Sequence, residues 1–95
     1  MSKYEILENK LTKISMHIDE MNLKDEASVK YLSQYKEYVE KLISAVKNKT
    51  IRKSDGAVLG LIRGISDYDE LCADEILWNL VTDADNYYSK ECKLF

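Results

Sequence analysis

The chain has 95 residues, of which 45% are hydrophobic and 33% are charged, a composition typical of one globular domain and not of a disordered segment. Its formal net charge of -3 is distributed unevenly: residues 1–53 carry eleven Lys/Arg and eight Asp/Glu, whereas residues 54–95 carry three and nine. The acidic second half argues against general nucleic-acid binding, because neutralising phosphates requires a dominant basic surface.

Two cysteines, Cys72 and Cys92, are too few for a disulfide scaffold and favour a reducing compartment. The segment "MSKYEILENK" does not have the basic-then-apolar pattern of a signal peptide, and no apolar run reaches the ~18 residues that span a bilayer. We therefore expect a cytoplasmic protein.

The first half of the chain predicts two long amphipathic helices, over about 3–21 and 26–47. Ser2 followed by Glu5 is the capping-box pattern of a helix start. Apolar residues then recur every three or four positions, as on one face of a helix, and the polar segment "NLKDE" separates two such stripes. The first stripe is Tyr4, Leu7, Leu11, Ile14, Ile18 and Met21, and the second is Ser28, Leu32, Tyr35, Val39, Leu42 and Val46.

The second half predicts two shorter helices and an apolar tail. A helix over about 56–65 carries Val58, Leu59, Leu61, Ile62 and Ile65, and is apolar almost all round. A last helix over about 72–89 carries Leu77, Val81, Ala84 and Tyr88 in helical spacing, and the tail 90–95 ends in two large apolar residues. Four helices with short connections predict one all-α domain, an antiparallel up-and-down four-helix bundle over 1–95.

Residue types with catalytic or metal-binding chemistry are present without the spacing that such chemistry needs. The acidic run "DYDELCADE" lacks the pattern of a calcium loop, and the single histidine, His17, has no glutamate three residues before it. No nucleophile lies beside a base in the sequence, and no glycine-rich phosphate loop occurs. We expect no catalytic site, no cofactor and no metal.

The chain contains one basic cluster, in the segment "KNKTIRK". Two interpretations fit it: a solvated loop, or a surface that meets an acidic partner or the anionic inner face of a membrane. The residues concerned are Lys47, Lys49, Arg52 and Lys53.

All three glycines lie in one segment, at Gly56, Gly60 and Gly64, beside a single arginine, Arg63. A spacing of four predicts a stripe on one helix face, where missing side chains permit close approach of another backbone. Each interior glycine lowers helix stability by about 1 kcal/mol relative to alanine. We therefore expect either that close helix packing offsets this loss or that the stripe serves as a groove for a ligand or partner. In the groove, Arg63 would be a donor to an anion.

The segments "AVLGLIRGISDY" and "ILWNLVTDADNYY", with the basic loop before them, resemble the third-to-fourth helix region of bacteriocin immunity proteins of the pediocin-like type. The similarity covers roughly residues 36–90. Its motif is matched by Arg63, Gly64, Ile65, Ser66 and Tyr68.

This resemblance implies a four-helix bundle that protects a Gram-positive producer cell without catalysis, as a determinant of antimicrobial peptide resistance. The protein would bind, from the cytosolic side, the mannose phosphotransferase permease that a bacteriocin has engaged, and would act as a monomer or weak dimer. The family's specificity is thought to lie in its C-terminal half. Candidate partner contacts here are therefore Arg63, Trp78, Tyr87, Tyr88, Leu94 and Phe95.

A second hypothesis comes from the glycines alone. It is a small anion- or nucleotide-binding module, or a phage-type inhibitor, whose ligand would occupy the groove of Gly56, Gly60 and Gly64 beside Arg63.

Overall fold

Three long helices, α1 (Lys3–Glu20), α2 (Glu26–Lys47) and α5 (Glu75–Glu91), make up most of the structure, a computed structural model that describes residues 2–94. Two short helices, α3 (Leu61–Ile65) and α4 (Asp69–Cys72), precede α5. The described part of the chain thus contains five helices and no strand, which confirms the all-α prediction.

Side chains cap each long helix at its start. Ser2 accepts a hydrogen bond from the Glu5 N–H of α1 at 3.2 Å, as the capping-box pattern predicts. Asp25 accepts one from the Ser28 N–H of α2 at 3.0 Å, and Asp74 accepts one from the Leu77 N–H of α5 at 2.9 Å. These oxygens satisfy backbone donors that have no partner within the helix, so that the helices begin where they do.

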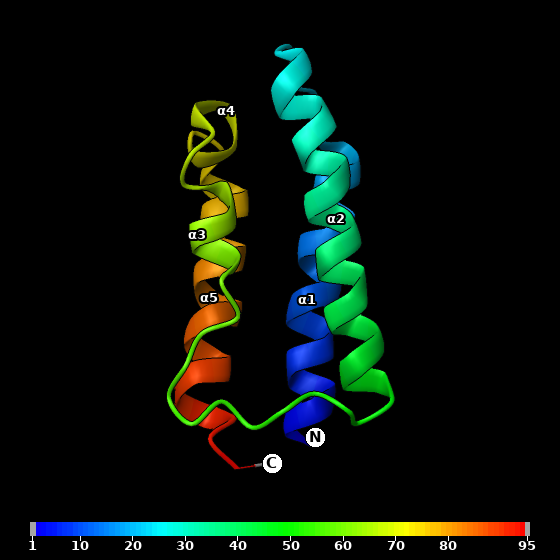
Figure 1. The fold of residues 1–95 in the computed structure, drawn as a ribbon, viewed down its shortest axis with the longest axis vertical. Helices are drawn as coiled ribbons and strands as arrows, with labels where there is room; N and C mark the ends of the chain where they lie inside the picture. Colours follow the sequence, from blue (N-terminus) through cyan, green and yellow to red (C-terminus); the bar gives the residue numbers. More distant parts are fainter. Residues whose placement is uncertain (1, 95) are drawn as a thin grey trace.

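The helix α1 runs antiparallel to both α2 and α5 along a molecule of 40 × 21 × 18 Å (Figure 1). α1 begins at one end, α2 returns to it, and the loop after α2 crosses to the other side of the molecule. The chain then rises through α3 to α4 at the far end, and α5 returns beside α1. α1 packs against both α2 and α5, whereas α3 and α4 pack on α5.

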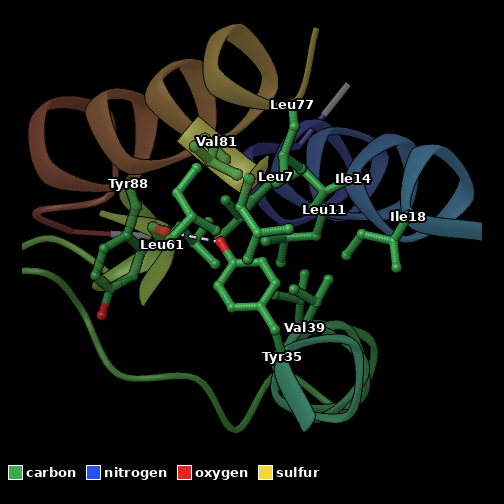
Figure 2. Packing of buried hydrophobic residues seen from close by; sticks show 14 of the residues in the cluster. Leu7, Leu11, Ile14, Ile18, Tyr35, Val39, Leu61, Leu77, Val81 and Tyr88 are labelled. Carbon is green, nitrogen blue, oxygen red and sulfur yellow. Dashed lines mark hydrogen bonds between the residues drawn. The ribbon is translucent and has the colours of Figure 1, made fainter. Parts of the chain in front are cut away.

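The core forms where the predicted apolar stripes meet. Figure 2 shows side chains from α1, α2, α3 and α5 converging on this region, including Leu11, Val39, Leu61 and Val81. Most positions of the predicted stripes are buried, whereas Tyr4, Met21 and Leu42 pack at the edge. The buried apolar residues are Leu7, Leu11, Ile14, Ile18, Leu32, Tyr35, Val39, Val46, Leu61, Ile65, Leu71, Leu77, Val81, Ala84, Tyr88 and Cys92.

The helix predicted over 56–65 is wrong in its first half. Gly56 and Gly60 have φ of +88° and +82°, and Asp55 has φ of +49°, all in the left-handed region that interrupts a right-handed helix. α3 therefore begins only at Leu61, and the chain before it is a loop. In place of the predicted third helix, the structure thus has a loop followed by a helix of five residues.

The last helix also differs from its predicted bounds of 72–89. Because Asp74 caps a new helix start, α5 begins at Glu75, and Asp69–Cys72 forms the separate helix α4. α5 continues to Glu91, so the predicted tail begins inside it. Cys92 is buried and its carbonyl accepts a hydrogen bond from the Ser54 N–H at 2.8 Å, which ties this segment to the loop.

No helix within residues 2–94 combines the length and the apolar composition that a membrane-spanning helix requires.

Candidate functional site

A buried carboxylate on α5 holds the start of α3. Asp85 is 1% exposed, and its two oxygens accept hydrogen bonds from three backbone N–H groups. The Leu59 N–H donates at 3.1 Å, the Leu61 N–H at 3.3 Å and the Ile62 N–H at 2.9 Å. Because Gly60 has no side chain to cap the helix, Asp85 supplies the missing cap from a distant part of the sequence.

Three tyrosines of α2 hold the same segment from the other side. Tyr35 donates its hydroxyl proton to the Leu61 carbonyl at 2.7 Å, the contact drawn as a dashed line in Figure 2. Tyr38 donates to the Leu59 carbonyl at 2.6 Å, and Tyr31 donates to the Gly64 carbonyl. Together the three tyrosines form a ladder of hydrogen bonds that fixes the backbone of residues 59–64.

The electrostatics of this ladder keep the tyrosines protonated. Burial raises the pKa of Tyr35 far above its ordinary value, and the nearby negative charge of Asp85 raises it further. Burial followed by Asp85 also raises the pKa of Tyr38. For Tyr31, burial raises the pKa and the stacked ring of Tyr68, at 4.1 Å between ring centroids, contributes next. The phenols thus remain hydrogen-bond donors over a wide pH range.

The glycines do not form the predicted stripe. Gly56 and Gly60 lie outside α3, and a Cβ added at either position would meet no atom within 4 Å. The prediction of close helix packing is wrong for both, because their positive φ serves loop geometry instead. At Gly64 an added Cβ would lie 2.7 Å from Cε1 of Tyr35, so this glycine does permit the close approach of α2 to α3.

Gly60 and Gly64 do line a small hollow of about 250 Å³ with residues of α2. Arg63 does not line it, and the lining contains no charged side chain. The anion donor that the groove hypothesis needs is therefore missing from this hollow. Its lining residues are Tyr31, Gln34, Tyr35, Tyr38, Gly60 and Gly64.

A larger hollow, of about 610 Å³, lies beside the first half of α5. Trp78, which is 38% exposed, forms part of its wall. Two other lining residues belong to the α3–α4 region: Ser66 donates its hydroxyl proton to the Ile62 carbonyl at 2.8 Å, and the Cys72 thiol donates to the Ile65 carbonyl at 2.9 Å. Glu75 and Asn79 complete the lining, so the hollow offers an exposed indole among polar groups.

The predicted contact residues do not gather in one place. Tyr88 is 7% exposed and donates its hydroxyl proton to the Arg52 carbonyl at 2.7 Å, so its prediction as a surface contact is wrong. Tyr87 is half-buried, with Lys10 Nζ 5.3 Å from its ring centroid. Trp78 precedes these two tyrosines by about 15 Å along α5.

The remaining predicted contacts lie at different ends of the molecule. Arg63 is exposed on α3, whereas Leu94 is 67% exposed beyond the end of α5. Phe95 lies outside the described residues. The sequence therefore named side chains on several surfaces, of which only Trp78 borders the 610 Å³ hollow.

His17 is not an isolated surface residue. Its Nε2 lies 3.0 Å from both carboxylate oxygens of Asp74, so the last turn of α1 is tied to the cap of α5. Burial by itself raises the pKa of Asp74, but hydrogen bonds from the Leu77 N–H and from His17 outweigh it, and the net pKa lies below the ordinary value. Within residues 2–94 no three His, Cys, Asp or Glu side chains are grouped closely enough to hold a metal ion.

Comparison of the chain with protein-family models, with curated proteins and with solved structures gave no match.

Asp85 is the residue that the sequence interpretation missed. A signal was present, because Asp85 lies four residues after Val81 and next to Ala84, within the apolar stripe of the last helix. A carboxylate on a buried face must be hydrogen-bonded or paired. The identity of its partners could not be found from spacing, since they lie more than twenty residues earlier in the chain.

Proposed function

We propose that this chain is a bacteriocin immunity protein that protects its producer by binding, without catalysis, the bacteriocin-engaged mannose phosphotransferase permease. It acts from the cytoplasm, at the inner face of the membrane. The permease complex is its partner, and the half of the chain that follows the basic loop carries the recognition.

The observation that carries this proposal is the way Arg63–Ser66, the core of the family-like motif, is held. Asp85 and Tyr35 fix the backbone just before this segment, at Ile62 and Leu61. Within it, Tyr31 donates a hydrogen bond to the Gly64 carbonyl, while the side chain of Arg63 is exposed. Ser66, at the end of the motif, borders the hollow that Trp78 lines. A rigid backbone that presents an exposed arginine and an exposed indole suits stoichiometric recognition, since tryptophan and arginine dominate binding hot spots.

The four-helix bundle of the family is compatible with this fold if the loop and α3 together take the place of the third helix. The chain then runs up, down, up and down, with α5 as the fourth leg (Figure 1). We propose this correspondence as the finer architecture.

A protection assay tests the function. The chain is expressed in a bacteriocin-sensitive Gram-positive strain, which is then challenged with a panel of pediocin-like peptides. We expect selective resistance to one or a few peptides, and we expect Trp78→Ala and Arg63→Ala to reduce it. Val29→Ala is the matched control, because Val29 is an exposed apolar residue on α2, away from the hollow.

Uniform sensitivity of the strain to all peptides, with expression verified, would refute the proposal. Equal protection by the Trp78→Ala and Val29→Ala variants would refute the assigned contact surface only. Truncation inside α5 is unsuitable for this purpose, because it would remove the buried Cys92 and the hydrogen bond that its carbonyl accepts from Ser54.

The second candidate, an anion-binding or phage-type inhibitor module, is less well supported. The hollow lined by Gly60 and Gly64 has no cationic wall, and Gly56 is not part of it. A thermal-shift titration with inorganic phosphate and with ATP tests this candidate, since binding to the native state alone raises the melting temperature. A rise that Arg63→Ala abolishes would favour it over the immunity role.

A further inference from the structure

Charge is separated along the long axis of the molecule. The end that holds the start of α1, the loop after α2 and the end of α5 is the basic end, comprising residues 2–10, 41–57 and 86–94 (Figure 1). It contains nine Lys/Arg and four Asp/Glu. The acidic end, residues 13–30 and 63–79, contains four and nine. A 40 Å molecule with a net charge of -3 thus has charges of +5 and -5 toward its two ends.

The cations of the basic end are available to an external anion. Among the described residues, no ion pair involves Lys47, Arg52 or Lys93, and all three are exposed. Lys53 approaches Asp55 only at 3.9 Å, with both side chains mostly in solvent. Exposed ion pairs of this kind are weak and are screened by salt, so they neutralise little of the positive charge at this end.

An apolar side chain lies among these cations. Leu94 is 67% exposed, and Lys3 Nζ donates a hydrogen bond to its carbonyl at 3.1 Å. Two residues earlier, Cys92 is buried and its carbonyl accepts a hydrogen bond from the Ser54 N–H, so the segment is held against the rest of the molecule. An exposed apolar side chain beside Lys3 and Lys93, at the basic end of the molecule, is the pattern of a surface that enters a lipid headgroup region.

We infer that the basic end docks on an anionic bilayer surface, with Leu94 inserted at the headgroup level and the long axis of the molecule directed away from the membrane. Lipid is favoured over nucleic acid because a phosphate backbone would use the cations but leave Leu94 in water. The acidic end reinforces the orientation, since the negative surface repels it. The inference deepens the proposed function and rests on it for its biological purpose, but the binding itself depends on purified components only.

Sedimentation with vesicles tests the docking. The protein is mixed with phosphatidylcholine vesicles that contain phosphatidylglycerol, and separately with pure phosphatidylcholine vesicles. We expect binding to the anionic vesicles alone, weakened by added salt. Each cation near an anionic surface contributes about fivefold in partitioning, so neutralising Arg52 and Lys53 together as Arg52→Gln/Lys53→Gln should weaken binding at least about tenfold.

Two matched controls isolate the surface. Lys24→Gln/Lys30→Gln changes the net charge equally but at the acidic end, and should leave binding within about twofold because these side chains face away from the bilayer. Leu94→Ser should weaken binding severalfold, whereas Val29→Ser, at the acidic end, should not. Equal losses from the two charge variants would overturn the inference, as would equal binding to both vesicle types.

Trp78, the single tryptophan, reports the orientation. It belongs to the acidic end, so its emission should not shift to shorter wavelength on vesicle binding, and iodide should quench it equally with and without vesicles. A blue shift with protection from iodide would overturn the end-on orientation. Failure of vesicle binding in a protein that still protects cells would reject the docking surface alone, whereas vesicle binding without protection would reject only the immunity role.

Discussion

Replacement of Asp85, the buried carboxylate of α5, by alanine should strongly destabilise the fold. Hydrogen bonds to a charged acceptor contribute about 1.5–3 kcal/mol each. Of the three N–H donors, that of buried Leu61 would lose its partner outright, whereas those of half-buried Leu59 and Ile62 would regain some water. We therefore expect a loss of about 3–5 kcal/mol, against a total stability of about 5–14 kcal/mol for a domain of this length.

Urea unfolding followed by circular dichroism measures this loss as a shift in midpoint at constant slope. Asp85→Asn is the gentler variant: it retains an acceptor for Leu59 and Leu61 but turns an amide donor toward the Ile62 N–H, and should cost about 2 kcal/mol. Asp83→Asn is the control, because Asp83 is an exposed partner of Lys10 on the same helix and should cost less than about 0.5 kcal/mol. A cost for Asp85→Ala no greater than that of Asp83→Asn would refute the anchoring role.

Three further outcomes follow from the same contacts. Gly64→Ala should destabilise by about 1–3 kcal/mol, although alanine favours a helix, because its Cβ would lie 2.7 Å from Tyr35 Cε1; a stabilised variant in the same urea assay would contradict the close approach. The pKa of Tyr35 is raised in the folded state, so its contribution to stability should be constant below about pH 10, where the unfolded phenol titrates, and should be lost as pH rises above it. Tyr35→Phe should flatten this alkaline slope, and an unchanged slope would contradict the assignment. The pKa of Asp74 is lowered, so its contribution to the free energy of unfolding is present above the ordinary value of 3.8 and is lost as pH falls below it. When unfolding is measured at decreasing pH, Asp74→Asn should therefore lose less stability than the unaltered protein. Equal stability curves for the two proteins would show that the contact between Asp74 and His17 does not contribute to acid stability.

The sequence by itself determined the long helices and the face that each one buries. Helical periodicity and capping side chains act within one or two turns, so Ser2 predicted the start of α1 and Leu7, Leu11 and Ile14 predicted its buried face. The same local logic failed over 56–65, because a spacing of four does not reveal that glycines adopt positive φ. Gly56 and Gly60 do so because hydrogen bonds from α5 and α2 hold that loop in place.

Tertiary structure alone decided which side chains form the candidate sites. Asp85 accepts hydrogen bonds at the start of α3, and Tyr35 donates one to Leu61, only when α2, α3 and α5 are packed together. Trp78 likewise shares a hollow with the α3–α4 region only in the folded structure. Charge behaves in the same way: the sequence shows a basic first half and an acidic second half, but the course of the chain up and down the long axis converts this into a basic end and an acidic end. Periodicity records which face of a helix is buried, whereas the partner of that face depends on contacts between residues far apart in the chain.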